Sequence, residues 1–160
     1  MTSLKLKPGQ QHFSAMIGVG GVGSGIFFAL EGNQTLGREE SRSGRFLDRR
    51  DYCKLHIVSH YVKRLLGTDF VVIPIGRVGD DQVGTTLLGE MQEAGLDLRY
   101  MERAAGEQTL FAVCFVYPDG SGGNLTGNRS ACATVDSSLV GRAEPEMATF
   151  AGHGIALAMP

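Results

Sequence analysis

Residues 70–98 constrain the fold of this chain more than any other part of its sequence. They open with an apolar and partly β-branched run at 70–75, which is typical of a buried strand. The run ends at 76–79, which reads Gly-Arg-Val-Gly. Because glycine carries no side chain to obstruct a bend, we expect a tight turn at these four residues.

A helix is predicted directly after this turn. Asp80 or Asp81 is placed to accept hydrogen bonds from the first N–H groups of the helix. Gly95 then supplies a stop signal. The apolar residues between them recur at helical spacing, namely Val83, Leu87, Met91 and Ala94. Strand, turn and capped helix form half of a βαβ unit, which predicts an α/β fold.

The order of residues in this unit is also similar to that of a known family. Residues 76–84 read Gly-Arg-Val-Gly-Asp-Asp-Gln-Val-Gly, and residues 94–97 read Ala-Gly-Leu-Asp. The pair of strings resembles the sugar kinases of the ribokinase family, also called PfkB carbohydrate kinases. In that family a G-x-V-G-x-D-x-x-G block leads into a helix that ends in a G-V-D-like turn. The resemblance covers about residues 14–140 and implies an α/β, ribokinase-like three-layer sandwich (its N-terminal portion) with a small β lid.

The resemblance also implies a division of the chain. Residues 1–13 would be a lead-in, and residues 14–160 would be the N-terminal part of a PfkB-like kinase domain. Lid segments are expected at about 26–46 and 98–127. Lids in this family often pair between subunits, so an exposed hairpin edge at 109–126 favours a homodimer, or alternatively a non-catalytic binding or dimerisation module.

The activity implied by the resemblance is ATP-dependent phosphorylation of a sugar or nucleoside hydroxyl, with Mg²⁺. In the family it depends on a late G-A-G-D motif, whose Asp accepts the hydroxyl proton and whose glycines form an anion hole. This sequence contains no such motif, and no Asp follows its late glycine pair, Gly152 and Gly154. We therefore expect no catalytic base, ATP site or metal ligand within these 160 residues, which would be an inactive fragment of a carbohydrate kinase.

The first substrate-binding candidates follow the first predicted strand, which begins at 14–17. The family usually places an Asn and an Asp just after that strand, and the Asp binds sugar hydroxyls. The corresponding residues here are Gly23, Ser24 and Gly25. Ser24 can donate and accept hydrogen bonds, but it supplies no carboxylate. The sequence therefore does not identify the sugar or nucleoside.

Further candidates lie at the next helix and at the glycine block. The family has a Gly-Gly pair and an Asn at the opening of that helix, where this sequence has Cys53, Lys54 and Val58. Lys54 is a candidate contact for a polar or anionic substrate, with a solvated lysine as the ordinary alternative. Gly79 and Asp80 complete the set, although Asp80 also suits a helix cap.

The helix in question is predicted at 48–66, with Asp48 or Asp51 near its start and Gly67 as its stop. Its apolar stripe consists of Leu55, Val58, Val62 and Leu65. Cys53, His56 and His60 share one helical face, a spacing that would suit three zinc ligands. No residue nearby clearly supplies a fourth ligand, and packed or hydrogen-bonded histidines are the alternative.

A second fingerprint offers a rival function. Gly18-x-Gly20-x-x-Gly23 follows a predicted strand, as in a dinucleotide-binding oxidoreductase domain. That site needs a helix directly after the glycines, because the pyrophosphate lies at the helix N-terminus. Residues 26–30 instead read as a short strand.

Later segments predict a hairpin and a final strand. Strands are expected at 109–117 and 124–126, joined by a turn that contains Pro, Asp and glycines. A short helix is expected from 135, a loop at 143–146 and a strand at 154–159.

Charge and composition exclude several classes of protein. The net charge of −2 favours neither nucleic-acid nor membrane-surface binding, and no run of 18 apolar residues predicts a membrane span. The odd number of cysteines, at Cys53, Cys114 and Cys132, predicts reduced thiols and a cytoplasmic protein. The expected partner is a small-molecule sugar or nucleoside.

Overall fold

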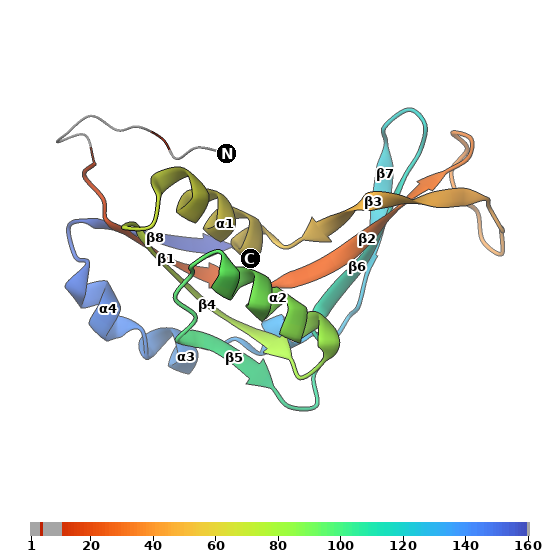
Figure 1. The fold of residues 1–160 in the computed structure, drawn as a ribbon. Helices are drawn as coiled ribbons and strands as arrows, with labels where there is room; N and C mark the ends of the chain where they lie inside the picture. The colour runs from red at the N-terminus through yellow and green to blue at the C-terminus, as the bar shows by residue number, and fades with distance from the viewer. Residues whose placement is uncertain (1–3, 5–10, 160) are drawn as a thin grey trace.

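A computed structural model of the protein describes residue 4 and residues 11–159, so most of the predicted lead-in at 1–13 lies outside the described residues. The described residues form two four-stranded sheets (Figure 1). The first sheet has the order β5-β4-β1-β8, and all its pairings are parallel. Its strands are β1 (Ala15–Gly20), β4 (Val71–Gly79), β5 (Tyr100–Ala104) and β8 (Gly154–Met159).

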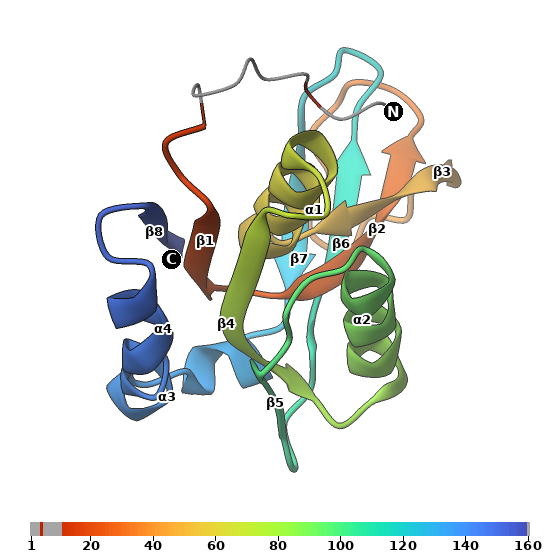
Figure 2. The ribbon, with the colours of Figure 1, turned by 60° about the vertical axis from the view of Figure 1, so that its left-hand side comes forward.

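Helices cover both faces of this sheet and produce three layers (Figure 2). One face is covered by α1 and α2, and the other by α3 and α4. The helices are α1 (Lys54–Leu66), α2 (Gln82–Glu93), α3 (Ser137–Gly141) and α4 (Glu144–Thr149).

The core is divided by the sheet into two clusters of buried residues. Met16 and Val72 pack with residues of α1 and α2, whereas their sequence neighbours Ile17 and Ile73 pack with Leu139 of α3. Successive side chains of a strand point to opposite faces, so a strand covered on both faces must be apolar throughout. Burying each of these large aliphatic side chains stabilises the fold by about 1.5–3 kcal/mol.

The second sheet has the order β3-β2-β6-β7 and extends away from the helices (Figure 1). Strand β2 pairs antiparallel with β3 and parallel with β6, and β6 and β7 form an antiparallel hairpin. Its strands are β2 (Gly23–Leu30), β3 (Gly44–Tyr52), β6 (Leu110–Val116) and β7 (Gly122–Thr126), and the 3-10 helix η1 (Ala131–Thr134) follows. The predicted lid segments 26–46 and 98–127 overlap this sheet, but β5 within the second segment belongs to the first sheet.

The predicted turn at 76–79 is wrong, because β4 continues to Gly79. Gly79 instead allows the end of β4 to approach the backbone of residues 107–109 closely. A Cβ atom there would lie 2.5 Å from both the carbonyl oxygen of Glu107 and the backbone nitrogen of Thr109. The strand can therefore pass beside the segment that leads into β6 only without a side chain at this position.

Asp81 is the N-cap of α2, and Asp80 is not. The Asp81 carboxylate accepts hydrogen bonds from the Gly84 N–H, the Thr109 N–H and the Thr109 hydroxyl, each at 2.7 Å. The Thr109 hydroxyl in turn accepts one from the Gly79 N–H at 2.9 Å. Burial opposes ionisation of Asp81, but the N–H groups of Thr109 and Gly84 and the Thr109 hydroxyl outweigh it and hold its pKa below the usual value.

Two predicted elements around the helices also need correction. The predicted helix 48–66 begins only at Lys54, because residues up to Tyr52 belong to β3. Its Leu65 is 36% exposed, and Leu66 packs against the core instead. The predicted loop at 143–146 contains the first turn of α4. Pro145 suits this turn, because the N–H groups of a first helical turn have no acceptor within the helix.

Other local predictions are confirmed. Gly67 and Gly95 follow α1 and α2 with φ angles of +91° and +80°, a conformation that glycine adopts without strain. The hairpin of β6 and β7 and the last strand, β8, lie where they were expected.

The dinucleotide fingerprint is not supported by its surroundings. Gly18 and Gly20 lie inside β1, and Gly23 begins β2, so a strand occupies the place of the required helix. The glycines therefore do not precede a helix N-terminus that would hold a pyrophosphate. Within residue 4 and residues 11–159, no helix is long and apolar enough to cross a membrane.

Asp81→Ala should lower the free energy of unfolding by roughly 2–4 kcal/mol, because it removes a helix cap and leaves the Thr109 N–H without an acceptor. Urea denaturation of the purified chain measures this loss. Asp80→Ala is the matched control: its side chain is 71% exposed and only faces Arg103 at 3.5 Å, so the change should stay within about 0.5 kcal/mol. Equal losses in the two variants would contradict the assignment of the cap.

Candidate functional site

Gly23 lies where β2, β6 and the start of α1 meet. Its carbonyl oxygen accepts a hydrogen bond from the Cys53 N–H at 3.2 Å. A Cβ atom on Gly23 would lie 2.6 Å from the Leu110 carbonyl oxygen and 3.0 Å from the Cys53 sulfur. Packing alone therefore requires glycine at position 23.

Ser24 and Gly25 face opposite sides of the second sheet, because they are consecutive residues of one strand. Ser24 lines a cavity of about 240 Å³ between β2 and α2, whose wall includes Val83 and Thr86. Gly25 pairs directly with Asp51 of β3. A Cβ atom on Gly25 would lie 2.5 Å from the Ala112 carbonyl oxygen and 3.1 Å from the Cβ of Asp51, so packing against β6 already requires glycine at this position.

The remaining candidates do not all gather at this point. Gly79 contacts Thr109 and so lies just before β6, whose first residue pairs with Gly23. Lys54 is exposed at the start of α1. Asp80 is exposed and faces Arg103 on β5. The structure therefore places Gly23, Ser24, Gly25 and Gly79 around the starts of β2 and β6, with Lys54 at the edge and Asp80 apart.

Asp51 is the residue at this point that the sequence reasoning missed. The sequence predicts Asp48 or Asp51 near the start of a helix, but Asp51 lies on β3, and the thiol of Cys114 donates a hydrogen bond to its Oδ2 at 3.4 Å. The segment 44–52 shows no alternation of apolar and polar residues that would have marked a strand. Only the pairing of Asp51 with Gly25 reveals its place.

The thiols near Asp51 are neutral at ordinary pH. Burial, then the thiol of Cys132 and the charge of Asp51, raise the pKa of Cys53 to about 11. Burial and the hydrogen bond to Asp51 also raise the pKa of Cys114. Protonated thiols are weak hydrogen-bond donors and poor nucleophiles, so covalent thiol chemistry is not favoured here.

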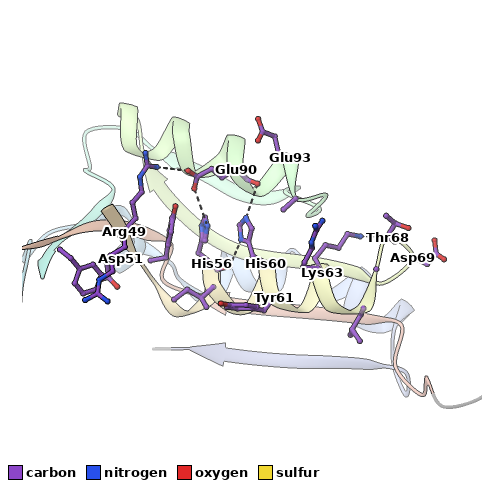
Figure 3. A pocket seen from close by; sticks show the side chains of 18 residues that line it. Arg49, Asp51, His56, His60, Tyr61, Lys63, Thr68, Asp69, Glu90 and Glu93 are labelled. Carbon is purple, nitrogen blue, oxygen red and sulfur yellow. Dashed lines mark hydrogen bonds and ion pairs between the residues drawn. The ribbon is translucent and has the colours of Figure 1, made fainter. Parts of the chain in front are cut away.

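A larger cavity, of about 1160 Å³, lies between α1, α2 and the end of β3 (Figure 3). Arg49 and Asp51 border it at one end, and Thr68 and Asp69 at the other. Arg50 and Glu90 form an ion pair of 3.1 Å between β3 and α2. The cavity thus has charged groups at both ends.

Three stacked rings form the wall of this cavity between its ends. The rings of Tyr52 and His56 stack at 4.6 Å, and those of His56 and His60 at 4.1 Å. His56 is 4% exposed, and its Nδ1 has no hydrogen-bond partner among the described residues. Its Nε2 lies 3.9 Å from a Glu90 carboxylate oxygen, beyond hydrogen-bond reach. Burial, and secondly His60, lower the pKa of His56 to about 4, so the ring is neutral.

The three residues proposed as zinc ligands are separated by this arrangement. His56 and His60 stack on each other, and the Nδ1 of His60 lies 2.9 Å from the His56 carbonyl oxygen. Cys53 lies against Gly23 instead. The part of the chain that the structure describes contains no group of three His, Cys, Asp or Glu residues that would hold a metal ion.

No family model and no curated protein matches the sequence, but many solved structures match the fold. Ribokinase from Giardia lamblia is 16% identical with a TM-score of 0.71, over 92% of this chain and 43% of that one. Ribokinase from Cryptococcus neoformans var. grubii in complex with ADP is 19% identical with a TM-score of 0.59, over 73% and 35%. A Burkholderia thailandensis nucleoside kinase in complex with inosine is 16% identical with a TM-score of 0.55, over 72% and 37%.

This likeness confirms the predicted ribokinase-like α/β fold. The chain spans less than half the length of each of these kinases. At such low identities the likeness concerns the fold, and fold alone does not determine function.

His56 should make the protein less stable in mild acid. The pKa of His56 in the folded chain is about 4, below the usual 6.5. Between these two pH values, histidine binds a proton in the unfolded state but not in the folded state. Above pH 6.5 the titration of His56 contributes nothing to the free energy of unfolding. As the pH falls to 4, it lowers that free energy by up to about 3 kcal/mol.

The test compares urea unfolding at pH 7 and pH 4.5 for the wild type, His56→Phe and the exposed-histidine control His12→Phe. His56→Phe should lose less stability on acidification than the other two proteins. An unchanged acid loss in His56→Phe would show that His56 is not the responsible group.

Proposed function

We propose that this chain is the substrate-binding side of a kinase that phosphorylates a hydroxyl group of a sugar or nucleoside with ATP and Mg²⁺. The observation that carries the proposal is the pairing of two sheets in the arrangement of ribokinase and nucleoside kinase structures. The candidate residues Gly23–Gly25 and Gly79 lie where the two sheets meet: Gly79 ends β4, and Gly23–Gly25 follow the carboxyl end of β1. Ligands of α/β proteins commonly bind at the carboxyl ends of such strands.

The residues described here suit only part of that reaction. Phosphoryl transfer needs an oriented hydroxyl and groups that neutralise the charge on the transferred phosphoryl. Ser24 and the glycine-lined segment offer polar contacts and close backbone approach for a hydroxylated ligand. The described residues offer no cluster that fits Mg²⁺, and the sequence has no Gly-Ala-Gly-Asp. We therefore derive no step of ATP or metal chemistry from them, and propose that other residues complete the enzyme.

The compartment proposed for this reaction is the cytoplasm. Cys53, Cys114 and Cys132 are all free thiols, and free thiols are typical of a reducing environment.

The purified 160-residue chain should bind a neutral sugar or nucleoside but should not phosphorylate it. A radiolabelled-ATP assay with Mg²⁺ and a panel of pentoses, hexoses and nucleosides measures transfer, and calorimetry on the same panel measures binding. Transfer of label to any acceptor would refute the inactive-fragment proposal. Reading the DNA downstream of Pro160 for an encoded Gly-Ala-Gly-Asp tests the same idea independently.

The second sheet also supports the proposal of a homodimer through the lid. Phe28 pairs in register with Phe46 and with Phe115, and Val113 pairs with Leu125, so these side chains share one face. Phe46 is 67% exposed and Leu125 is 65% exposed. Large exposed apolar residues on one sheet face are typical of an interaction surface, and we propose that a second copy of this chain covers it.

Leu125→Asp should shift the protein toward the monomer, because it places a charge in the proposed apolar interface. Asn124→Asp is the control, since residue 124 points to the opposite face of β7 and should leave association unchanged. Sedimentation velocity over a range of concentrations measures both. A wild type that stays monomeric at high micromolar concentration would overturn the proposed dimer.

A further inference from the structure

Asp51 lies on the same side of the second sheet as two of the residues proposed to bind the substrate, Gly23 and Gly25. Asp51 pairs in register with Gly25, so both face the same side of the second sheet. Gly23 shares this face, being two residues before Gly25 on the same strand. A Cβ atom at position 25 would lie 2.5 Å from the Ala112 carbonyl oxygen, so β2 carries glycine directly opposite Asp51. On this side of the strand pair, β3 provides the carboxylate.

The carboxylate of Asp51 also has a weaker hydrogen-bond partner than the other carboxylates that are not exposed. It is half-buried, and its one hydrogen bond among the described residues comes from the weak thiol donor of Cys114 at 3.4 Å. Within residues 11–159, every other carboxylate that is not exposed has an N–H, O–H or cationic partner: Asp81, Glu90, Asp97, Glu102, Glu107 and Glu146.

The carboxylate of Asp51 therefore keeps acceptor capacity that no described residue uses, and it can accept hydrogen bonds from a ligand. The nearby cation does not provide one, because the Arg49 guanidinium lies over the Phe27 ring, 4.1 Å from its centroid, and forms no ion pair with Asp51. Asp51 borders the cavity of about 1160 Å³, so an external molecule can reach this region (Figure 3).

We infer that Asp51 binds the hydroxyl groups of the substrate, in place of the carboxylate that residues 23–25 lack, an inference that rests on the proposed function. A carboxylate has lone pairs for two neighbouring hydroxyl donors, which matches the vicinal diol of a sugar or of the ribose in a nucleoside. The thiols of Cys53 and Cys114 beside it are uncharged, and the Arg49 guanidinium lies over the Phe27 ring. The carboxylate itself repels a phosphate placed next to it, so this position favours neutral hydroxylated ligands over sugar phosphates.

The first experiment measures binding to the full 160-residue chain by calorimetry. The probes are D-ribose, D-fructose and inosine, together with ribose 5-phosphate and fructose 6-phosphate. The wild type should bind at least one neutral probe, and Asp51→Asn should bind it at least tenfold more weakly, because the charge-assisted hydrogen bonds are lost. Asp48→Asn removes an exposed carboxylate of the same strand and should change affinity less than twofold.

The outcomes separate this inference from the function on which it rests. If the wild type binds a neutral probe and Asp51→Asn binds it equally well, the role of Asp51 is wrong and the proposed function stands. If the wild type binds only the sugar phosphates, the inference is also overturned. If the wild type binds none of the five probes, the substrate-binding function itself fails, and the inference fails with it.

A second measurement needs no variant and so does not depend on folding of a mutant. In wild-type protein labelled with ¹³C-aspartate, the carboxyl resonance of Asp51 should shift on addition of the bound neutral probe, whereas that of Asp48 should not. Equal or absent shifts at the two residues, in a protein that binds the probe, would overturn the inference.

Discussion

The carboxylate of Asp81 holds the two sheets of this protein in their relative positions. It accepts hydrogen bonds from α2 at Gly84 and from the segment before β6 at Thr109, and Thr109 in turn binds the end of β4 at Gly79. Strand β6 begins at the next residue, Leu110, and pairs with β2. One polar cluster thus joins the core sheet, its covering helix and the second sheet. Hydrogen bonds to a charged acceptor are the stronger ones, which suits a junction of this kind.

This junction also explains the glycines of the motif in physical terms. A Cβ atom on Gly84 would lie 2.8 Å from the Thr109 hydroxyl oxygen, and one on Gly79 would lie 2.5 Å from the Thr109 nitrogen. Both glycines are therefore needed so that Thr109 can approach the carboxylate. Their spacing around Asp81 reflects contact with a residue far along the chain, whereas the predicted role of Gly79 was in a local turn at 76–79.

The fold was predictable from the sequence because its signals are local and strong. The apolar run of β4, the spacing of Leu87 and Met91 and the stop at Gly95 depend on burial within one unit. The start of α1 was not predictable in the same way. Strand β3 lies at the edge of the second sheet, where both faces meet solvent, so its side chains need not alternate between apolar and polar. The charged residues of β3 come just before the apolar stripe of α1, so in the sequence they resemble the first turn of that helix.

The candidate site shows why a motif position alone does not locate a functional group. The resemblance predicts a carboxylate near 23–25, where the sequence has Gly23, Ser24 and Gly25. In a sheet, however, a residue on one face has its nearest neighbours on the adjacent strands, and Gly25 has Asp51 directly opposite. A carboxylate on β3 can thus lie directly beside position 25 of β2. Under the role proposed for Asp51, the same strand pairing would keep a hydroxyl-binding group although the linear motif at 23–25 is absent.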